Sequence, residues 1–254
     1  FKTSSNLERQ FIRFDSVGAF RTAPQRIYQY TGEAPNAVGR DGDKSAQMLA
    51  SSAASRSKSR TSVIRSVSQW FKESGAAKNL KIKSLTNRHF EITVEDQAGH
   101  VSNITDSGFG CSQALPVLAA GFNLISSKRT SLPAIFVVQE PEIHLHPSAA
   151  AHMGTYFSEL ANNNVQCFVE THSENIILRI AHHVASGDLL AEDVNIYWVS
   201  ANSGEHTITP LPLSDDGTFT EKWPEGFFPT RSEETLNLAR AATNKRDILS
   251  EALD

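Results

Sequence analysis

Two short apolar segments separated by one helical segment constrain the fold of this chain more than any other feature. PAIFVVQE (133–140) and NVQCFVE (164–170) have the composition of buried strands, and PSAAAHMGTYFSELANN (147–163) between them has helical periodicity. This order predicts a βαβ unit, in which two parallel strands are joined by a right-handed crossover. Ligands of such sheets bind beyond the carboxyl ends of the strands, where Glu140 and His172 fall.

The first part of the chain has a different character. Residues 1–43 mix short apolar pieces with Gly and Pro, which predicts loops with short strands or helices, and residues 44–60 are small and polar, which predicts an exposed surface loop. The segment 61–75 places its apolar residues on one helical stripe and ends in Gly75, so we expect an amphipathic helix. Alternating apolar and polar residues at 79–105 predict short antiparallel strands.

More helices and strands follow a glycine-rich segment at 106–113. The periodicity predicts helices over 112–127 and 173–187, strands within 195–213, and a polar helix on the surface or against a partner from about Pro229. We therefore expect an α/β fold, with a parallel sheet flanked by helices and a small antiparallel β and helical insertion.

Composition and charge narrow the class of protein. The chain has 254 residues, 39% of them hydrophobic, and a net charge of -4, so we expect a globular protein without a global positive field toward nucleic acid or membrane. Its two cysteines have no disulfide or zinc spacing, which favours a reducing, cytoplasmic setting. No uninterrupted apolar run approaches the roughly 18 residues that span a bilayer, and the start lacks the pattern of a signal peptide. A first residue of Phe rather than Met indicates part of a longer product.

Acidic residues end the first apolar strand. AIFVVQEPEIHLHP (134–147) delivers Gln139, Glu140 and Glu142 to a loop. Metal-assisted phosphoryl chemistry needs this arrangement, because one oxygen ligand holds Mg²⁺ while a second carboxylate orients the attacking water. A capped strand end with Glu140 in solvent explains the same residues equally well.

A histidine follows the second strand. In CFVETHSEN (167–175) the strand ends at Glu170 and His172 comes directly afterwards. A histidine at this place can donate a hydrogen bond to a γ-phosphate oxygen or to the attacking water. The alternative is simple capping, with Ser173 as the N-cap of the next helix.

The glycine-rich segment DSGFGCSQ (106–113) opens a helix. Glycines let the backbone approach an anion, and the first N–H groups of a helix point at whatever lies there, so a phosphate cradle is one interpretation. A short glycine loop alone is a weak signal, and an ordinary loop is the alternative.

The order of these three segments resembles that of the ABC ATPase superfamily, in which a signature motif, a Walker B strand, a D-loop and a switch histidine follow one another. DSGFGCSQALPVL, QEPEIHLHP and ETHSEN are most similar to the soluble branch near the SMC proteins and the overcoming-lysogenization-defect ATPases, whose members are identified as AAA family ATPases. RTAPQRIYQYTGE, VGRDGD and WPEGFFPTRSEETLNL also resemble that branch.

The resemblance implies a role for each motif residue. Glu140 would polarise the attacking water, and His172 would sense the γ-phosphate. Gln139 stands where an acidic residue usually supports Mg²⁺, so its lack of charge puts the strength of metal binding in doubt, and Glu142 is close enough in sequence to compensate. The residues implied in the signature loop, which contacts ATP on the opposite subunit, are Gly108, Gly110, Ser112 and Gln113.

Residues His144 to His146 would lie in the D-loop at a dimer interface. They also form a His-x-His pattern of the kind that binds metal, although no third ligand is indicated. By the resemblance the chain divides into an incomplete N-terminal region at 1–105, an ATPase lobe at 106–213 and a helical extension at 214–254.

One essential part of such an ATPase is not in this sequence. A P-loop needs Gly-Lys-Ser/Thr at the start of a helix, because the lysine neutralises the phosphates and the hydroxyl holds Mg²⁺. None of the 14 glycines is followed by lysine. We therefore expect the Walker A lobe to be missing from this sequence, disordered or supplied by another chain, and this chain alone to hydrolyse ATP poorly.

Three functions fit these observations. The leading hypothesis is an ATP- and Mg²⁺-dependent ABC-type ATPase that dimerises around ATP and controls a partner such as a nuclease or DNA; its relatives suggest prokaryotic anti-phage defence. The second is a scaffold whose degenerate site binds nucleotide without turnover. The third is a metal nuclease that uses Glu140, Glu142, His144 and His146.

Overall fold

The computed structural model describes residues 13–55, 62–126, 133–202, 205–223 and 234–241. The chain forms two compact units, Phe1–His183 and Val184–Asp254.

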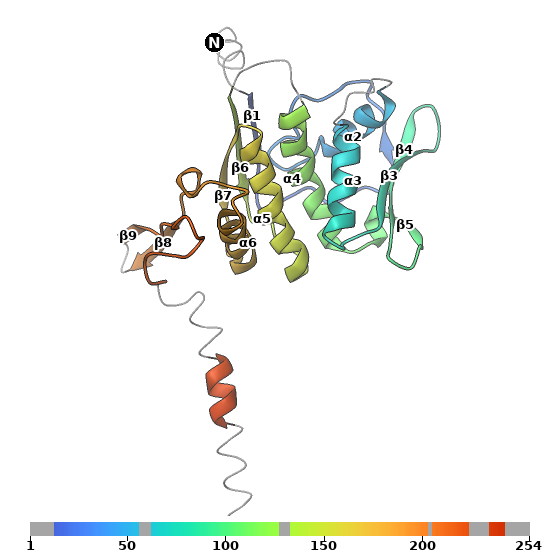
Figure 1. Cartoon of the computed structure of the whole chain (residues 1–254). Helices are drawn as coiled ribbons and strands as arrows, with labels where there is room; N and C mark the ends of the chain where they lie inside the picture. Colours follow the sequence, from blue (N-terminus) through green and yellow to red (C-terminus); the bar gives the residue numbers. More distant parts are fainter. Residues whose placement is uncertain (1–12, 56–61, 127–132, 203–204, 224–233, 242–254) are drawn as a thin grey trace, which may run out of the picture. The chain divides into compact units, whose positions relative to one another are not determined.

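A three-stranded parallel sheet forms the centre of the first unit (Figure 1). Its order is β1 (Arg13–Val17), β6 (Ala134–Gln139) and β7 (Val165–Glu170). Strands β6 and β7 are joined by helix α5 (Pro147–Asn162) and pair in parallel, which confirms the predicted βαβ unit.

Strand β1 was not predicted as part of this sheet. It pairs in parallel with β6, and this pairing crosses the boundary expected at residue 105. The sequence gives no period there because RFDSV has a charged residue, Asp15, at an inward position, where only 3% of its surface is exposed. Hydrogen bonds from the backbone N–H groups of Ser16 (2.9 Å) and Val38 (3.0 Å) compensate that burial.

Helices α4 (Phe109–Ser126) and α5 cover one face of the sheet, as Figure 1 shows, and α6 (Glu174–Ala185) packs on α5. The inward strand residues Val17, Phe136 and Val138 are at most 1% exposed, so the core lies between this face and the helices. Helix α4 is long and apolar enough by composition to span a bilayer, but 72% of that span is buried in the core. Its hydropathy is that of a core helix.

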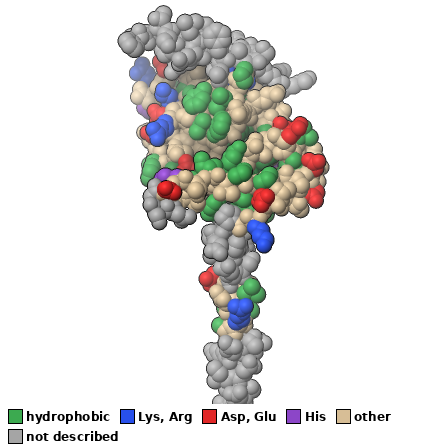
Figure 2. All heavy atoms as spheres, turned by 90° about the vertical axis from the view of Figure 1, so that its left-hand side faces the viewer, with side chains coloured by type: hydrophobic (Ala, Val, Ile, Leu, Met, Phe, Trp, Pro, Cys, Tyr) green, Lys and Arg blue, Asp and Glu red, His purple; other side chains and the backbone are tan. Residues whose placement is uncertain are grey.

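The opposite face of the same sheet is apolar and exposed. Phe14 on β1 and Phe168 on β7 have 56% and 52% of their surface exposed, and Ile135 and Val137 on β6 lie between them in the register. Figure 2, which faces the side where these strands lie in Figure 1, shows hydrophobic side chains gathered on the surface. Within the described residues, this face has no covering helix like those on the other side.

A second, antiparallel sheet confirms the predicted insertion. Its order is β2 (Tyr28–Gln29), β4 (His89–Glu95) and β3 (Asn79–Ser84), with β5 (Val101–Asn103) also paired to β4. Helix α3 (Val63–Glu73) buries its predicted stripe, and Gly75 follows it with φ +75°, a left-handed conformation that glycine adopts without strain. A one-turn helix, η1 (Ile104–Asp106), leads from β5 to α4.

The prediction of a surface loop over 44–60 was wrong for its first part. Residues Ser45–Ala54 form helix α2, and Met48 and Leu49 are buried against the core. The helix consists mainly of Ala and Ser, whose small side chains give little periodic signal but allow close packing. The basic residues at 56–61 lie outside the described part of the chain.

The second unit contains the two strands predicted within 195–213, and they pair as a β-hairpin. Strands β8 (Tyr197–Asn202) and β9 (Glu205–Pro210) pair antiparallel, and a short helix η2 (Ala191–Asp193) precedes them. Residues 234–241 are helical and exposed, which agrees with the polar helix expected near the end of the chain. The boundaries proposed at 105 and 213 stay predictions.

Candidate functional site

The two predicted catalytic residues lie together at the carboxyl edge of the parallel sheet. The register pairs Gln139 with Glu170, so β6 and β7 end side by side, and the residues that follow them meet. His172 Nε2 lies 3.2 Å from Glu140 Oε1. The His172 side chain is 83% exposed and that of Glu140 23%, so the pair faces solvent on the histidine side.

Glu140 has an unusual backbone. Its φ is +45°, a left-handed conformation that is rare for a non-glycine residue and that occurs often at functional sites. Its N–H donates to the carbonyl oxygen of Glu170 at 2.8 Å, which ties the turn after β6 to the end of β7. The side chain is thus directed by a strained turn and not by a regular strand.

The surroundings raise the pKa of Glu140. Burial is the largest cause, and the negative charge of Glu142 adds to it, while His172 acts in the opposite direction. A carboxylate with a raised pKa is a stronger base than an ordinary carboxylate, so it accepts a proton from water more readily. A raised pKa is one property that a general base needs, and the catalytic role of Glu140 stays a prediction.

Glu142 fixes the loop that carries the histidine. One of its oxygens, Oε1, accepts hydrogen bonds from Thr171 Oγ1 at 2.6 Å and from the backbone N–H of His172 at 2.9 Å. Sequence reasoning assigned Glu142 to metal support. The structure shows it bonded to the loop after β7, where it holds His172 near Glu140.

Gln139 and Glu170 form the second polar pair of the edge. Gln139 Nε2 donates to Glu170 Oε2 at 2.7 Å, so the amide nitrogen is used and its oxygen is left for another partner. Glu170 was noted only as the end of a strand. The signal that would have found it is its position in register with Gln139 on the neighbouring strand.

The predicted signature loop and D-loop contact each other. A Cβ on Gly110 would come within 2.7 Å of the carbonyl oxygen of His144, so only glycine allows this approach. The rings of Phe109 and His144 lie 5.7 Å apart, and Phe109 is 64% exposed. Gly108 has φ +82° and open space around its Cα.

Ser112 and Gln113 lie apart from this exposed loop. The helix begins at Phe109, earlier than predicted, so both residues fall in its first turns, where they are 6% and 7% exposed. Ser112 Oγ donates to the carbonyl oxygen of Phe109 at 2.9 Å. The structure brings Gly108 and Gly110 to the D-loop and places Ser112 and Gln113 inward; their contact with ATP stays a prediction.

The His-x-His segment does not form a metal centre. His146 Nδ1 pairs with Ser148 Oγ at 2.9 Å and caps α5, and His144 contacts Phe109. Among the residues that the structure describes, no three His, Cys, Asp or Glu side chains are arranged to hold a metal ion. The metal-nuclease interpretation therefore has no geometric support.

The same edge is compatible with Mg²⁺ bound together with a nucleotide. Mg²⁺ prefers oxygen ligands, and it commonly uses one or two protein groups plus phosphates and water. The free amide oxygen of Gln139 and the carboxylates of Glu140 and Glu170 supply such oxygens. Because Gln139 is neutral, most of the protein's negative charge at this place comes from the two glutamates.

One residue at the site escaped sequence reasoning. Arg21, in the loop after β1, donates through Nη2 to the carbonyl oxygens of Gln139 and Glu140, each at 2.7 Å. Its segment had been noted only as part of a family resemblance. No local pattern predicts a contact between residues so far apart in sequence.

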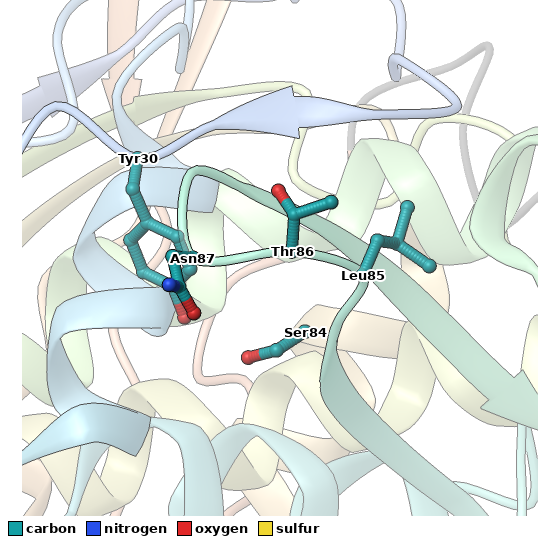
Figure 3. Close-up of a pocket in the computed structure, with 5 residues that line it drawn as sticks. All are labelled: Tyr30, Ser84, Leu85, Thr86 and Asn87. Carbon is teal, nitrogen blue, oxygen red and sulfur yellow. The ribbon is translucent and has the colours of Figure 1, made fainter.

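A hollow of about 580 Å³ lies at the turn between β3 and β4. Figure 3 shows its lining residues, which are Tyr30, Ser84, Leu85, Thr86 and Asn87. None of them belongs to the predicted site, and the group has no charged side chain.

Comparison with known proteins gives one family and several distant structures. The family described as AAA ATPase domain matches residues 31–177. No curated protein matches this chain.

One similar solved structure comes from work described as structural biochemistry of ATP-driven dimerization and DNA stimulated activation of SMC ATPases. It has 16% identity and a TM-score of 0.43, over 59% of this chain and 83% of that one. The Smc head of Pyrococcus furiosus bound to the C-terminal domain of ScpA has 15% identity and a TM-score of 0.43, over 78% of this chain and 40% of that one. The SMC head domain from Thermotoga maritima has 14% identity and a TM-score of 0.38, over 67% and 52%. This chain thus spans about half or less of the two latter structures. Likenesses with TM-scores below 0.5 carry no argument about the fold of this chain or about what it binds.

Proposed function

Because this chain belongs to the AAA ATPase domain family, whose match covers more than half of it, we propose that it forms the hydrolytic half of an ABC-type ATP site. The observation that carries this proposal is the pair of Glu140 and His172, 3.2 Å apart at the carboxyl ends of adjacent parallel strands. Ligands of parallel sheets bind at this edge.

In this proposal Glu140 accepts the proton of the attacking water. Its raised pKa suits that role, and its φ of +45° places it in a strained turn at the end of β6. The exposed imidazole of His172 donates a hydrogen bond to the γ-phosphate or to the water. Bound Mg²⁺, supported by the Gln139 oxygen, would neutralise charge on the phosphates.

The P-loop of this site comes from residues outside this sequence, since no glycine here precedes a lysine. Parallel sheets are normally covered on both faces. We place the P-loop element on the exposed apolar face of the sheet, which carries Phe14, Ile135, Val137 and Phe168. At the carboxyl ends of its strands this face borders the edge that holds Glu140. Packing there would bring a helix start to the catalytic carboxylate.

We further propose that two copies close around ATP. The exposed Phe109 and the open surroundings of Gly108 suit a loop that faces a second copy across the nucleotide. A cytoplasmic assembly in which this closure controls a nuclease or DNA, as in anti-phage defence, is the wider hypothesis.

A specific observation also favours the scaffold alternative. Gln139 is neutral and its amide nitrogen is already bonded to Glu170, so the metal support is weaker than an acidic residue would give. In that case the site would bind nucleotide and close without turnover.

ATP turnover by the assembly that contains this chain separates the two functions. The assembly is purified through a tag on the chain, and phosphate release is measured for the wild type, for E140Q and for the matched variant E159Q, which changes a carboxylate on α5. The ATPase proposal predicts release that E140Q abolishes and E159Q preserves. Nucleotide binding without release would support the scaffold, and release by the tagged chain alone would contradict the need for a separate P-loop.

A further inference from the structure

Arg21 is the most extensively bonded side chain near the site, and neither the predicted motifs nor the proposed chemistry uses it. Its guanidinium donates four hydrogen bonds to backbone carbonyl oxygens. Nε donates to Gly18 at 3.1 Å, Nη1 to Gln113 at 3.0 Å, and Nη2 to Gln139 and Glu140 at 2.7 Å each. All four acceptors are main-chain atoms, so the contacts fix the backbone itself.

These carbonyls come from three different parts of the fold. Gly18 follows β1, Gln113 lies in α4, four residues after the start of that helix at Phe109, and Gln139 and Glu140 end β6. One side chain therefore joins the first strand, the helix of the predicted signature loop and the turn that carries the proposed base.

Arg21 stays charged in this setting. Burial lowers its pKa to about 10, while the nearby carboxylates of Glu142 and Glu140 act in the opposite direction. A pKa of about 10 leaves the guanidinium protonated at neutral pH. Hydrogen bonds from a charged donor are shorter and stronger than neutral ones, which agrees with the two distances of 2.7 Å.

The strongest pair of contacts lies where the backbone is strained. Glu140 has φ +45°, and such conformations persist only when the surrounding structure holds them in place. Arg21 bonds the carbonyl oxygens on both sides of the Glu140 N–Cα unit, namely those of Gln139 and of Glu140 itself. Loss of these two hydrogen bonds would therefore destabilise the left-handed conformation of Glu140.

We propose that Arg21 is a positioning residue, which holds the turn of Glu140 and ties its place to that of α4. A displacement of the signature helix would then move the Gln113 carbonyl, Arg21 and the backbone of the base together. This proposal rests on the proposed ATPase function for its consequence, while the bonding itself does not depend on ATP. The Glu140 carboxylate would then be placed for catalysis only while the Gln113 carbonyl of α4 keeps its hydrogen bond to Arg21.

Lysine cannot replace Arg21 in this role. An ammonium group is a single point donor, whereas the planar guanidinium spreads its N–H groups over acceptors that lie in different directions. The R21K variant keeps the positive charge but loses the planar set of N–H donors, so it tests the hydrogen bonds separately from the charge. R88K, at an exposed position in the turn between β3 and β4, is the matched control.

Amide hydrogen exchange on the full chain tests the bonding directly. The reporters are the N–H of Glu140, bonded to the Glu170 carbonyl, and the N–H of His172, bonded to Glu142. R21K is expected to speed exchange at both by about 10- to 100-fold, as the loss of one or two charge-assisted bonds implies, with no change at Ile92 in β4. R88K should leave all three amides at wild-type rates. Wild-type exchange at Glu140 and His172 in R21K, or equal acceleration at Ile92, would overturn the proposal.

Kinetics of the tagged assembly supply the second readout. A misplaced base lowers kcat and leaves KM unchanged, so R21K is expected to lose about 10- to 100-fold in kcat. If the assembly shows no turnover at all, the ATPase proposal fails while the exchange result stands. If R21K lowers thermal stability and speeds exchange throughout, Arg21 has only a structural role and the proposal is wrong.

Discussion

The buried carboxyl group of Asp15 gives the first unit a measurable dependence on pH. Asp15 lies on the inward face of β1 and is 3% exposed. Burial raises its pKa from 3.8 to about 6, although hydrogen bonds from the backbone N–H groups of Val38 and Ser16 lower it in part. Replacement by asparagine keeps the shape and removes the titration.

The sign and size follow from linkage. Between about pH 4 and pH 6 the folded state binds a proton at Asp15 that the unfolded state has released, so this group's contribution to the free energy of unfolding falls as pH rises. A shift from 3.8 to about 6 corresponds to a loss of about 3 kcal/mol, complete above pH 6. Below pH 4 the contribution is fully present. D15N also loses one acceptor for a backbone N–H, but that cost does not change with pH.

Urea denaturation between pH 4 and pH 7 measures this difference. Trp70 is 3% exposed in the first unit and reports its unfolding when Trp198 and Trp223 of the second unit are replaced by Phe. The free energy of unfolding of the wild type minus that of D15N is expected to fall by about 3 kcal/mol over this range, since other carboxylates cancel in the difference. A difference that is constant, or that rises with pH, would refute the assignment of a raised pKa to Asp15.

Three further predictions concern close contacts and a thiol. G110A places a Cβ 2.7 Å from the His144 carbonyl oxygen, so it should displace the D-loop and reduce turnover of the assembly about 10-fold or more, with a smaller effect on thermal stability. G121A places a Cβ against Tyr156 Oη, which donates a hydrogen bond to the Val117 carbonyl oxygen at 2.7 Å. Urea denaturation should show a loss of roughly 3 kcal/mol, and an unchanged midpoint would show that the ring relaxes freely. Partial burial raises the pKa of Cys167 to about 12, so iodoacetamide should label it much more slowly in the native than in the unfolded chain, and equal rates would contradict the raised pKa.

The parallel unit was predictable because its strands and helix carry complete local patterns. AIFVVQ and VQCFVE are apolar runs that end in polar residues, and the helix between them has a clear period, so the meeting of Glu140 and His172 followed from topology alone. The stripe of α3 was equally visible, since its four buried residues recur at helical spacing.

Other parts depend on contacts that leave no local signal. Strand β1 has an inward Asp15, whose carboxylate accepts hydrogen bonds from the backbone N–H of its neighbour Ser16 and from that of Val38, 23 residues away. Helix α2 has small residues that reveal no face, and its burial depends on α3 and α4. Three of the four carbonyl groups that Arg21 bonds are 92 to 119 residues away. Carbonyl oxygens have the same chemistry in every residue, so no sequence pattern marks them.

The most direct test of the account is a single-turnover measurement of ATP hydrolysis by the tagged assembly, with wild-type chain and with E140Q. Glu140 as general base predicts a rate that falls about 100-fold or more in E140Q, while the dissociation constant of ATP stays within about twofold of the wild type. Hydrolysis by E140Q at the wild-type rate would contradict the central claim that this carboxylate, paired with His172, activates the water.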